Sequence, residues 1–246
     1  AFDAIFPGKI VWRDVYEYRP DNFTKTINLT SDYNSIWPEC NNSRTDVISI
    51  IHNRSAPRTR QSIYVRDFGD PETPWALPVF NMVSREDKEL HRSERVSILI
   101  IGKNIWNTPP CILRRIFTNF SEIDFHYVNN FMYAWDHASP NIHYHANIPA
   151  CDFFDLLLKS HYILCDHGYV NYFRATMSST IMNAYSCGAR LIMPDTWEYD
   201  LETPLRYNLD SKLTLTPPDL EPIFAERDAL IAHRNSVYDA FLPKIA

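Results

Sequence analysis

The second half of the chain, from residue 96 onward, alternates continuous apolar runs with amphipathic stretches. The apolar runs are rich in β-branched residues and end in polar or glycine residues, which is typical of strands covered on both faces in a parallel sheet. The stretches between them space their apolar residues as amphipathic helices do. This alternation indicates a doubly wound α/β domain. The pattern predicts strands at 96–104, 124–130, 141–147, 161–166 and 191–193, and helices at 111–120, 150–160, 178–187 and 220–241.

The first half of the chain has a weaker pattern. Short β-rich runs at 46–52 and 62–66 are interpreted as buried strands, and 76–83 is a candidate for a third strand. The segment 84–95 is charged throughout and has helical spacing without an apolar face, so we interpret it as an exposed helix or a linker. This segment is also the best candidate for a boundary between two domains.

The composition is that of a globular, acidic chain. With 246 residues and 45% hydrophobic side chains, the chain can bury a substantial core. The net charge of -6 and the pI of about 5.8 argue against binding of nucleic acid by bulk electrostatics, because such binding depends on Lys and Arg. The five cysteines are scattered and show no Cys-x-x-Cys spacing, which disfavours a zinc site and a disulfide framework.

The sequence also bears on location. No apolar run is long enough to span a bilayer, so we expect a soluble chain without a transmembrane segment. Five Asn-x-Ser/Thr sequons would suit a secretory lumen, but a chain rich in Asn, Ser and Thr contains such sequons by chance. A cytoplasmic location is therefore favoured over a secretory lumen.

The helix predicted at 178–187 begins with the hydroxyl residues Ser178, Ser179 and Thr180. A helix N-terminus gathers unpaired backbone N–H groups and the positive end of the helix dipole, so this turn suits a phosphate group. Gly188 is expected to end the helix, because the chain must turn back before the next strand. The sequence therefore predicts an anion site at the start of this helix.

Residues that directly follow predicted strands are further candidates, because ligands of open parallel sheets bind beyond the carboxyl ends of the strands. Lys103 can place an ammonium on a diphosphate, although a solvated lysine is an equally good interpretation. Arg174 offers a forked, permanently charged donor set that suits phosphate, and the alternative is a salt-bridged arginine beside an ordinary helix cap. Asp195 and Glu198 can accept hydrogen bonds from sugar hydroxyls, whereas Asp195 can equally cap the following turn. A nucleotide base can stack on one of the rings after the strand at 161–166, namely Tyr169, Tyr172 or Phe173.

A family resemblance coincides with the predicted anion site. In 180–195, a hydroxyl residue, two apolar residues and a polar residue precede Ala-x-x-Cys-Gly, an apolar strand and Pro-Asp. This pattern resembles the donor-sugar-nucleotide segment of GT-B glycosyltransferases. The upstream stretch 155–169 is similar to the helix and strand that precede the segment, most like those of exostosin-type enzymes. The resemblance covers the chain from residue 96 onward, and the earlier part shows no family pattern.

The resemblance implies an α/β fold of the GT-B type with two Rossmann-like domains. The small N-terminal acceptor-side domain would span 1–92, and a nucleotide-sugar-binding domain with a parallel sheet would span 93–246, with the last helix packing back on the first domain. A UDP-sugar or GDP-sugar would be a substrate, and no cofactor is implied. Asn183 stands where many retaining GT-B enzymes have a glutamate, and it can still hydrogen-bond a ribose without charge. Together with the residues that follow predicted strands and those at the helix start, the candidate donor-binding residues are Lys103, Asp166, His167, Tyr169, Arg174, Ser178, Ser179, Thr180, Asn183, Asp195 and Glu198.

Glycosyl transfer needs the departing diphosphate to be stabilised by a metal or by fixed protein cations. Metal-dependent transferases of the other major fold usually carry an Asp-x-Asp motif after a strand, and this sequence has none. We therefore expect Lys103, Arg174 and the helix N-terminus to meet this charge, and we predict no metal site. His143 and His145 alternate on one face of a predicted strand and are a possible metal-binding pair, but two histidines without a third ligand are more often structural.

In an inverting reaction one side chain takes the proton from the acceptor hydroxyl, and in GT-B enzymes this base usually comes from the N-terminal domain. The residues at strand ends there are His52, Asp67 and Asp70, each of which also has an ordinary structural interpretation. The expected function is that of a hexosyl- or pentosyltransferase, which moves a sugar from a nucleoside diphosphate to a hydroxyl of a glycan acceptor without a required metal. Two alternatives remain: a non-catalytic nucleotide-sugar-binding or scaffold domain, and a DNA-base glucosyltransferase, against which the acidic composition counts.

Overall fold

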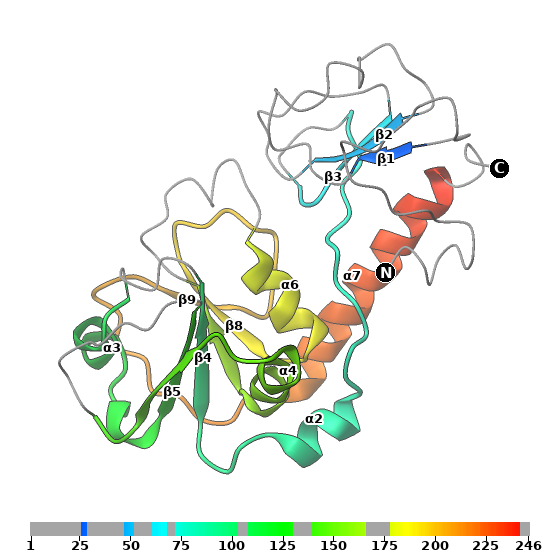
Figure 1. Cartoon of the computed structure of the whole chain (residues 1–246). Helices are drawn as coiled ribbons and strands as arrows, with labels where there is room; N and C mark the ends of the chain where they lie inside the picture. The colour runs from blue at the N-terminus through cyan, green and yellow to red at the C-terminus, as the bar shows by residue number, and fades with distance from the viewer. Residues whose placement is uncertain are drawn as a thin grey trace.

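The structure of the protein, a computed structural model, describes residues 26–28, 47–51, 61–67, 72–102, 108–129, 139–165 and 178–241 (Figure 1). The described strands form two sheets in which every strand pair is parallel. The smaller sheet has the order β1-β2-β3, with β1 (Thr26–Asn28), β2 (Val47–Ile51) and β3 (Gln61–Tyr64). The larger sheet has the order β6-β5-β4-β7-β8-β9, with β4 (Ser97–Ile101), β5 (Asp124–Asn129), β6 (Ile142–Ala146), β7 (Tyr162–Leu164), β8 (Arg190–Pro194) and β9 (Leu205–Tyr207).

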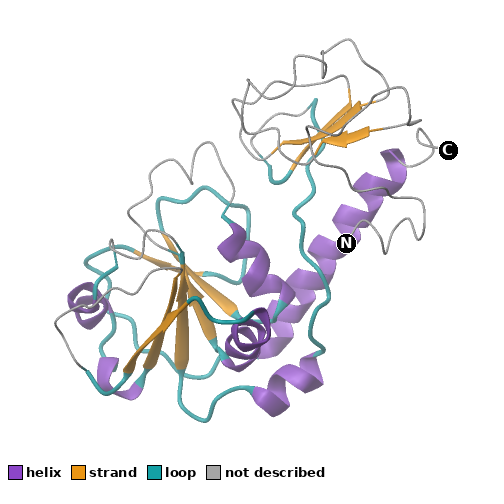
Figure 2. Cartoon of the chain, viewed as in Figure 1, coloured by secondary structure: helices purple, strands orange, loops and turns teal. Residues whose placement is uncertain are grey.

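Helices cover both faces of the larger sheet (Figure 2). Ile98 and Ile100 of β4 pack in one hydrophobic cluster with Leu113 of α3, whereas Leu99 packs in a second cluster with Leu157 of α4. Successive strand residues point to opposite faces, so burial on both faces explains the continuous apolar run. The predicted doubly wound α/β architecture is confirmed. The helices are α2 (Arg85–His91), α3 (Pro110–Ile116), the 3₁₀ turn η4 (Phe120–Glu122), α4 (Ala150–Lys159), α6 (Ser179–Ser186) and α7 (Leu220–Phe241).

The elements predicted for the second half are all present, with ends that differ by a few residues. The helix predicted at 111–120 is split, because α3 ends at Ile116 and η4 follows as a separate turn. The strands β1 and β9 were not predicted. Both are only three residues long, so their sequences carry too short a pattern to recognise.

The candidate strand at 76–83 is wrong. Leu77, Val79 and Val83 are buried in the same cluster as α6, but their backbone joins no sheet. Side chains form hydrogen bonds with this backbone instead. Arg234 of α7 donates to the carbonyl of Val79, Arg227 donates to that of Val83, and the backbone N–H of residue 80 donates to the hydroxyl of Ser186. The apolar pattern therefore came from burial of an irregular segment whose hydrogen-bond partners come from helices.

The segment 84–95, predicted as an exposed helix or linker, contains α2, whose residues are exposed except Lys88. The helix α7 begins beside the larger sheet, and its C-terminal end points towards the smaller one (Figure 1). His233 of α7 hydrogen-bonds the carbonyl of Trp75 at 2.9 Å, and the two rings lie 4.2 Å apart. The division of the chain at residue 92 stays a prediction. Within the described residues, no helix has the length and apolar character needed to cross a membrane.

Candidate functional site

The start of α6 has the features predicted for an anion site. Ser178 is the N-cap, with extended backbone, and its hydroxyl oxygen accepts a hydrogen bond from the N–H of Thr180 at 3.3 Å. Ser179 is exposed and Ser178 half-buried, whereas Thr180 is only 7% exposed. Two of the three predicted hydroxyl residues therefore reach the surface. The first turn has no acidic residue, unlike that of α2, so no carboxylate offsets the positive end of the helix dipole.

The rest of α6 is fixed firmly in the core. Ile181, Ala184 and Tyr185 are at most 1% exposed, and the Tyr185 hydroxyl donates to Glu226 of α7 at 2.5 Å. The chain turns away from the helix at Gly188, two residues after its last residue, and the φ of +64° there is readily adopted only by glycine. This turn was predicted from the sequence and is confirmed. Because the helix is held along its length, the backbone N–H groups at its start have a fixed direction.

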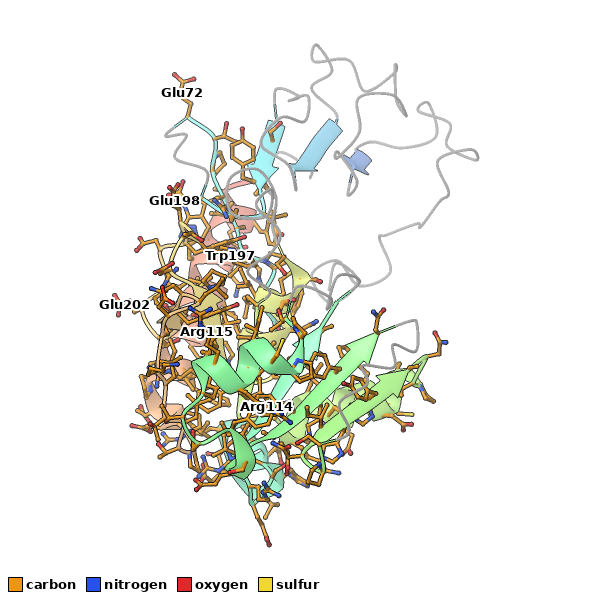
Figure 3. The ribbon with its side chains drawn as sticks, turned by 90° about the vertical axis from the view of Figure 1, so that its left-hand side faces the viewer. Glu72, Arg114, Arg115, Trp197, Glu198 and Glu202 are labelled. Carbon is orange, nitrogen blue, oxygen red and sulfur yellow. The ribbon has the colours of Figure 1, made fainter. Side chains whose placement is uncertain are left out.

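The predicted residues around the neighbouring strand ends differ in their exposure and in their hydrogen-bond partners. Asp195 follows β8 and is exposed, but its carboxylate accepts a hydrogen bond from Asn208 at 2.9 Å, as a turn residue would. Glu198 is exposed at the surface, next to the buried Trp197 (Figure 3). Asn183 is half-buried within α6. The roles of these side chains toward a donor sugar stay predictions.

Near the smaller sheet, which we also call the first sheet, one of the predicted catalytic residues is described by the structure. Asp67 is exposed beyond the end of β3, and its carbonyl accepts a hydrogen bond from Nε of Arg66 at 3.2 Å. Its role as a base stays a prediction. The other predicted residues lie outside the described residues: His52, Asp70, Lys103, Asp166, His167, Tyr169 and Arg174.

Sequence reasoning missed Arg66. Its side chain is buried, with 5% exposure, and its guanidinium lies 4.0 Å from the centroid of the Tyr199 ring. Burial raises the pKa of Tyr199, while the charge and hydrogen bond of Arg66 and a hydrogen bond from the Ser178 backbone act in the opposite direction. Arg66, Tyr199 and the N-cap of α6 therefore meet at one place. The strand-end rule would have found Arg66, which stands directly before Asp67.

The histidines of β6 gain a third neighbour. Nδ1 of His126 on β5 lies 3.0 Å from Nε2 of His145, and the ring centroids of His126 and His143 are 4.8 Å apart. Burial, together with the neighbouring His143 and His145, lowers the pKa of His126 to about 4. Among the residues that the structure describes, no group of three or more His, Cys, Asp and Glu is arranged to hold a metal ion.

Comparisons with solved structures identify the fold. AviGT4, a glycosyltransferase involved in avilamycin A biosynthesis, superposes with a TM-score of 0.55 at 11% identity, over 81% of this chain and 67% of that one. The glycosyltransferase SnogD from Streptomyces nogalater superposes with a TM-score of 0.41 at 16% identity, over 78% of this chain and 51% of that one. The kitacinnamycin glycotransferase superposes with a TM-score of 0.43 at 12% identity, over 76% of this chain and 55% of that one. This chain therefore spans about half the length of SnogD and of the kitacinnamycin enzyme.

No family model matches the chain, and no curated protein matches its sequence. The structural likeness to AviGT4 shows that the fold is that of GT-B glycosyltransferases, and at this identity it shows the fold alone. The predicted fold class is confirmed. The more specific resemblance to exostosin-type enzymes stays a prediction.

Proposed function

We propose that the chain is a glycosyltransferase that binds a UDP-sugar or GDP-sugar, with the diphosphate at the start of α6, and transfers the sugar to a hydroxyl of a glycan acceptor. The observation that carries this proposal is the first turn of α6. It is a capped helix start with an exposed serine, Ser179, and no carboxylate, following a strand of a parallel sheet in a GT-B fold.

The chemistry follows from the charge that develops on the departing diphosphate. Backbone N–H groups fixed by the buried face of α6 need no reorganisation when that charge appears, which is the condition for electrostatic catalysis. Lys103 and Arg174 are proposed to add cations, so that no metal is required. The acceptor proton would pass to His52, Asp67 or Asp70, of which Asp67 is exposed at the end of β3.

A second candidate function is binding of a nucleotide sugar without turnover. Asn183 favours it, since a neutral amide in α6 stands where many retaining enzymes carry a glutamate. Such a protein would share the phosphate site and lack the transfer step. Binding and turnover must therefore be measured separately.

Binding is tested by calorimetry with UDP, GDP and their sugars. Ser179→Asp places a carboxylate in the exposed first turn of α6, where it stabilises the helix and repels phosphate. Ala150→Asp is the matched control, because Ala150 is the exposed first residue of α4. We expect wild type and Ala150→Asp to bind one nucleoside diphosphate equally, and Ser179→Asp to bind it about tenfold more weakly, a difference of about 1.4 kcal/mol. Equal affinity of all three proteins, or no binding at all, would contradict the proposal.

Turnover is tested with the donor that binds most tightly, by measuring nucleoside diphosphate released in the presence of a glycan acceptor panel. A transferase releases the nucleotide only with a suitable acceptor, and Ser179→Asp slows that release. Tight binding without release across the panel would favour the binding function over the transferase.

A further inference from the structure

Arg66 is a buried cation at the end of the first sheet. It stands two residues after β3 and is 5% exposed. A charged side chain is seldom this buried unless surrounding groups stabilise the charge. Its position at the carboxyl end of a parallel strand is where ligands of such sheets bind.

The ring of Tyr199 determines where the guanidinium of Arg66 lies. The two groups are 4.0 Å apart, close enough for a cation–π interaction. The ring is itself held in place, because Arg206 of β9 donates to the carbonyls of Trp197 and Tyr199 at 2.6 and 2.8 Å. Tyr199 also packs on the hydrophobic cluster that contains α6. Arg66 therefore packs on a tyrosine from the segment between β8 and β9, two strands of the larger sheet.

That support adjoins the predicted phosphate site. The Tyr199 side chain lies within hydrogen-bonding reach of both Arg66 and the backbone N–H of Ser178, the N-cap of α6. A cation from the first sheet and the N-terminus of a helix from the second sheet thus converge on one tyrosine. Both are groups that bind phosphate oxygens.

We infer that Arg66 is a diphosphate-binding residue supplied by the first sheet, and that Tyr199 positions its guanidinium beside the start of α6. The inference rests on the proposed function and names a donor contact outside the second sheet. Arginine binds phosphate through a rigid fork of N–H groups, and an aromatic support orders that fork before the ligand arrives. Donor binding then draws on residues of both sheets.

The test uses the full chain and compares a nucleoside diphosphate with its nucleoside, because only the former carries the phosphates. UDP with uridine, and GDP with guanosine, are titrated into wild type, Arg66→Met and Arg66→Lys. Arg227→Met is the matched control. Arg227 is 4% exposed and lies 4.2 Å from the ring of Phe224, so its loss removes a comparable buried cation–π pair.

We expect Arg66→Met to weaken binding of the diphosphate about tenfold or more and to leave nucleoside binding within about twofold. Arg66→Lys keeps the charge without the fork and should give a smaller loss. Arg227→Met should leave the ratio of the two dissociation constants unchanged. If Arg66→Met does not fold, Arg66→Lys decides by the same ratio.

The two proposals fail in different ways. If wild type binds no nucleoside diphosphate, the proposed function itself is wrong. If wild type binds one and the folded Arg66 variants keep the wild-type ratio, the role of Arg66 is overturned and the site at α6 stands. A loss in Arg227→Met as large as that in Arg66→Met would also overturn it, because the effect would then be structural.

Discussion

Lys88 of α2 is a buried lysine whose ionisation should be visible in the stability of the protein. It is 1% exposed, and its Nζ donates to the carbonyls of Leu157 and Ser160 at the end of α4, at 2.8 and 2.7 Å. The pKa of Lys88 is lowered from 10.5 to about 7, mainly by burial; the nearby Cys187 opposes this shift and Arg92 contributes to it. A neutral amine still has two N–H groups, so it can satisfy both carbonyls without a charge.

The sign of the pH dependence follows from proton binding. Between pH 7 and 10.5 the unfolded lysine is protonated and the folded one is largely neutral, so the unfolded chain binds more protons. The free energy of unfolding then rises with pH, by about 1.4 kcal/mol per pH unit from this one group. Between pH 7.5 and 9.5 the gain is about 2–3 kcal/mol.

Lys88→Met removes the titrating group and leaves both carbonyls of α4 without their donor. We expect it to lower the free energy of unfolding by about 1–3 kcal/mol at pH 7.5. The deficit relative to wild type should widen by a further 2–3 kcal/mol, approximately, at pH 9.5. Urea unfolding at a series of pH values measures both quantities.

Lys159→Met is the control, because Lys159 is exposed and pairs with Asp155 on the surface of α4. Its unfolding free energy should follow the wild-type pH dependence. An unfolding free energy of Lys88→Met that also runs parallel to that of wild type from pH 7.5 to 9.5 would refute this expectation, since Lys88 would then titrate alike in the folded and unfolded chain.

Two further predictions concern the turn after α6 and the histidines of β5 and β6. Gly188→Ala should lower the free energy of unfolding by about 2–4 kcal/mol in urea titrations, because φ is positive and an added Cβ meets the Phe224 ring at 2.4 Å; a loss below about 1 kcal/mol would contradict this. The pKa of His126 is lowered to about 4 on folding, so wild type should lose stability as the pH falls below 6.5. His126→Gln should reduce that loss by about 1 kcal/mol between pH 6.5 and 5, whereas a variant of the exposed His91 should not.

The order of strands and helices in the second half was predictable because its cause is local. Burial on both faces of the sheet favours the continuous apolar run 98–101 of β4, and the start of α6 needs a capping residue such as Ser178. Gly188 was likewise predictable, since the reversal after a short helix favours a residue with positive φ.

What escaped prediction depends on contacts between distant residues. The apolar pattern of 76–83 indicates burial, but only the packing of α7 shows that arginine side chains replace strand partners there. His126 joined the histidine pair because β5 and β6 align it opposite His143, and this register cannot be read from one strand. Arg66 meets Tyr199, a residue more than a hundred positions away, through the packing of two sheets.

The most direct test of the phosphate site is hydrogen exchange at the start of α6. The first N–H groups of a helix have no partner within the helix and therefore exchange rapidly until a ligand accepts their hydrogen bonds. We predict that the nucleoside diphosphate bound by wild type slows exchange in a peptide covering the N-cap Ser178 and the first turn of α6, and leaves exchange in the first turn of α4 unchanged. Unaltered exchange at α6 under saturating nucleotide would contradict it.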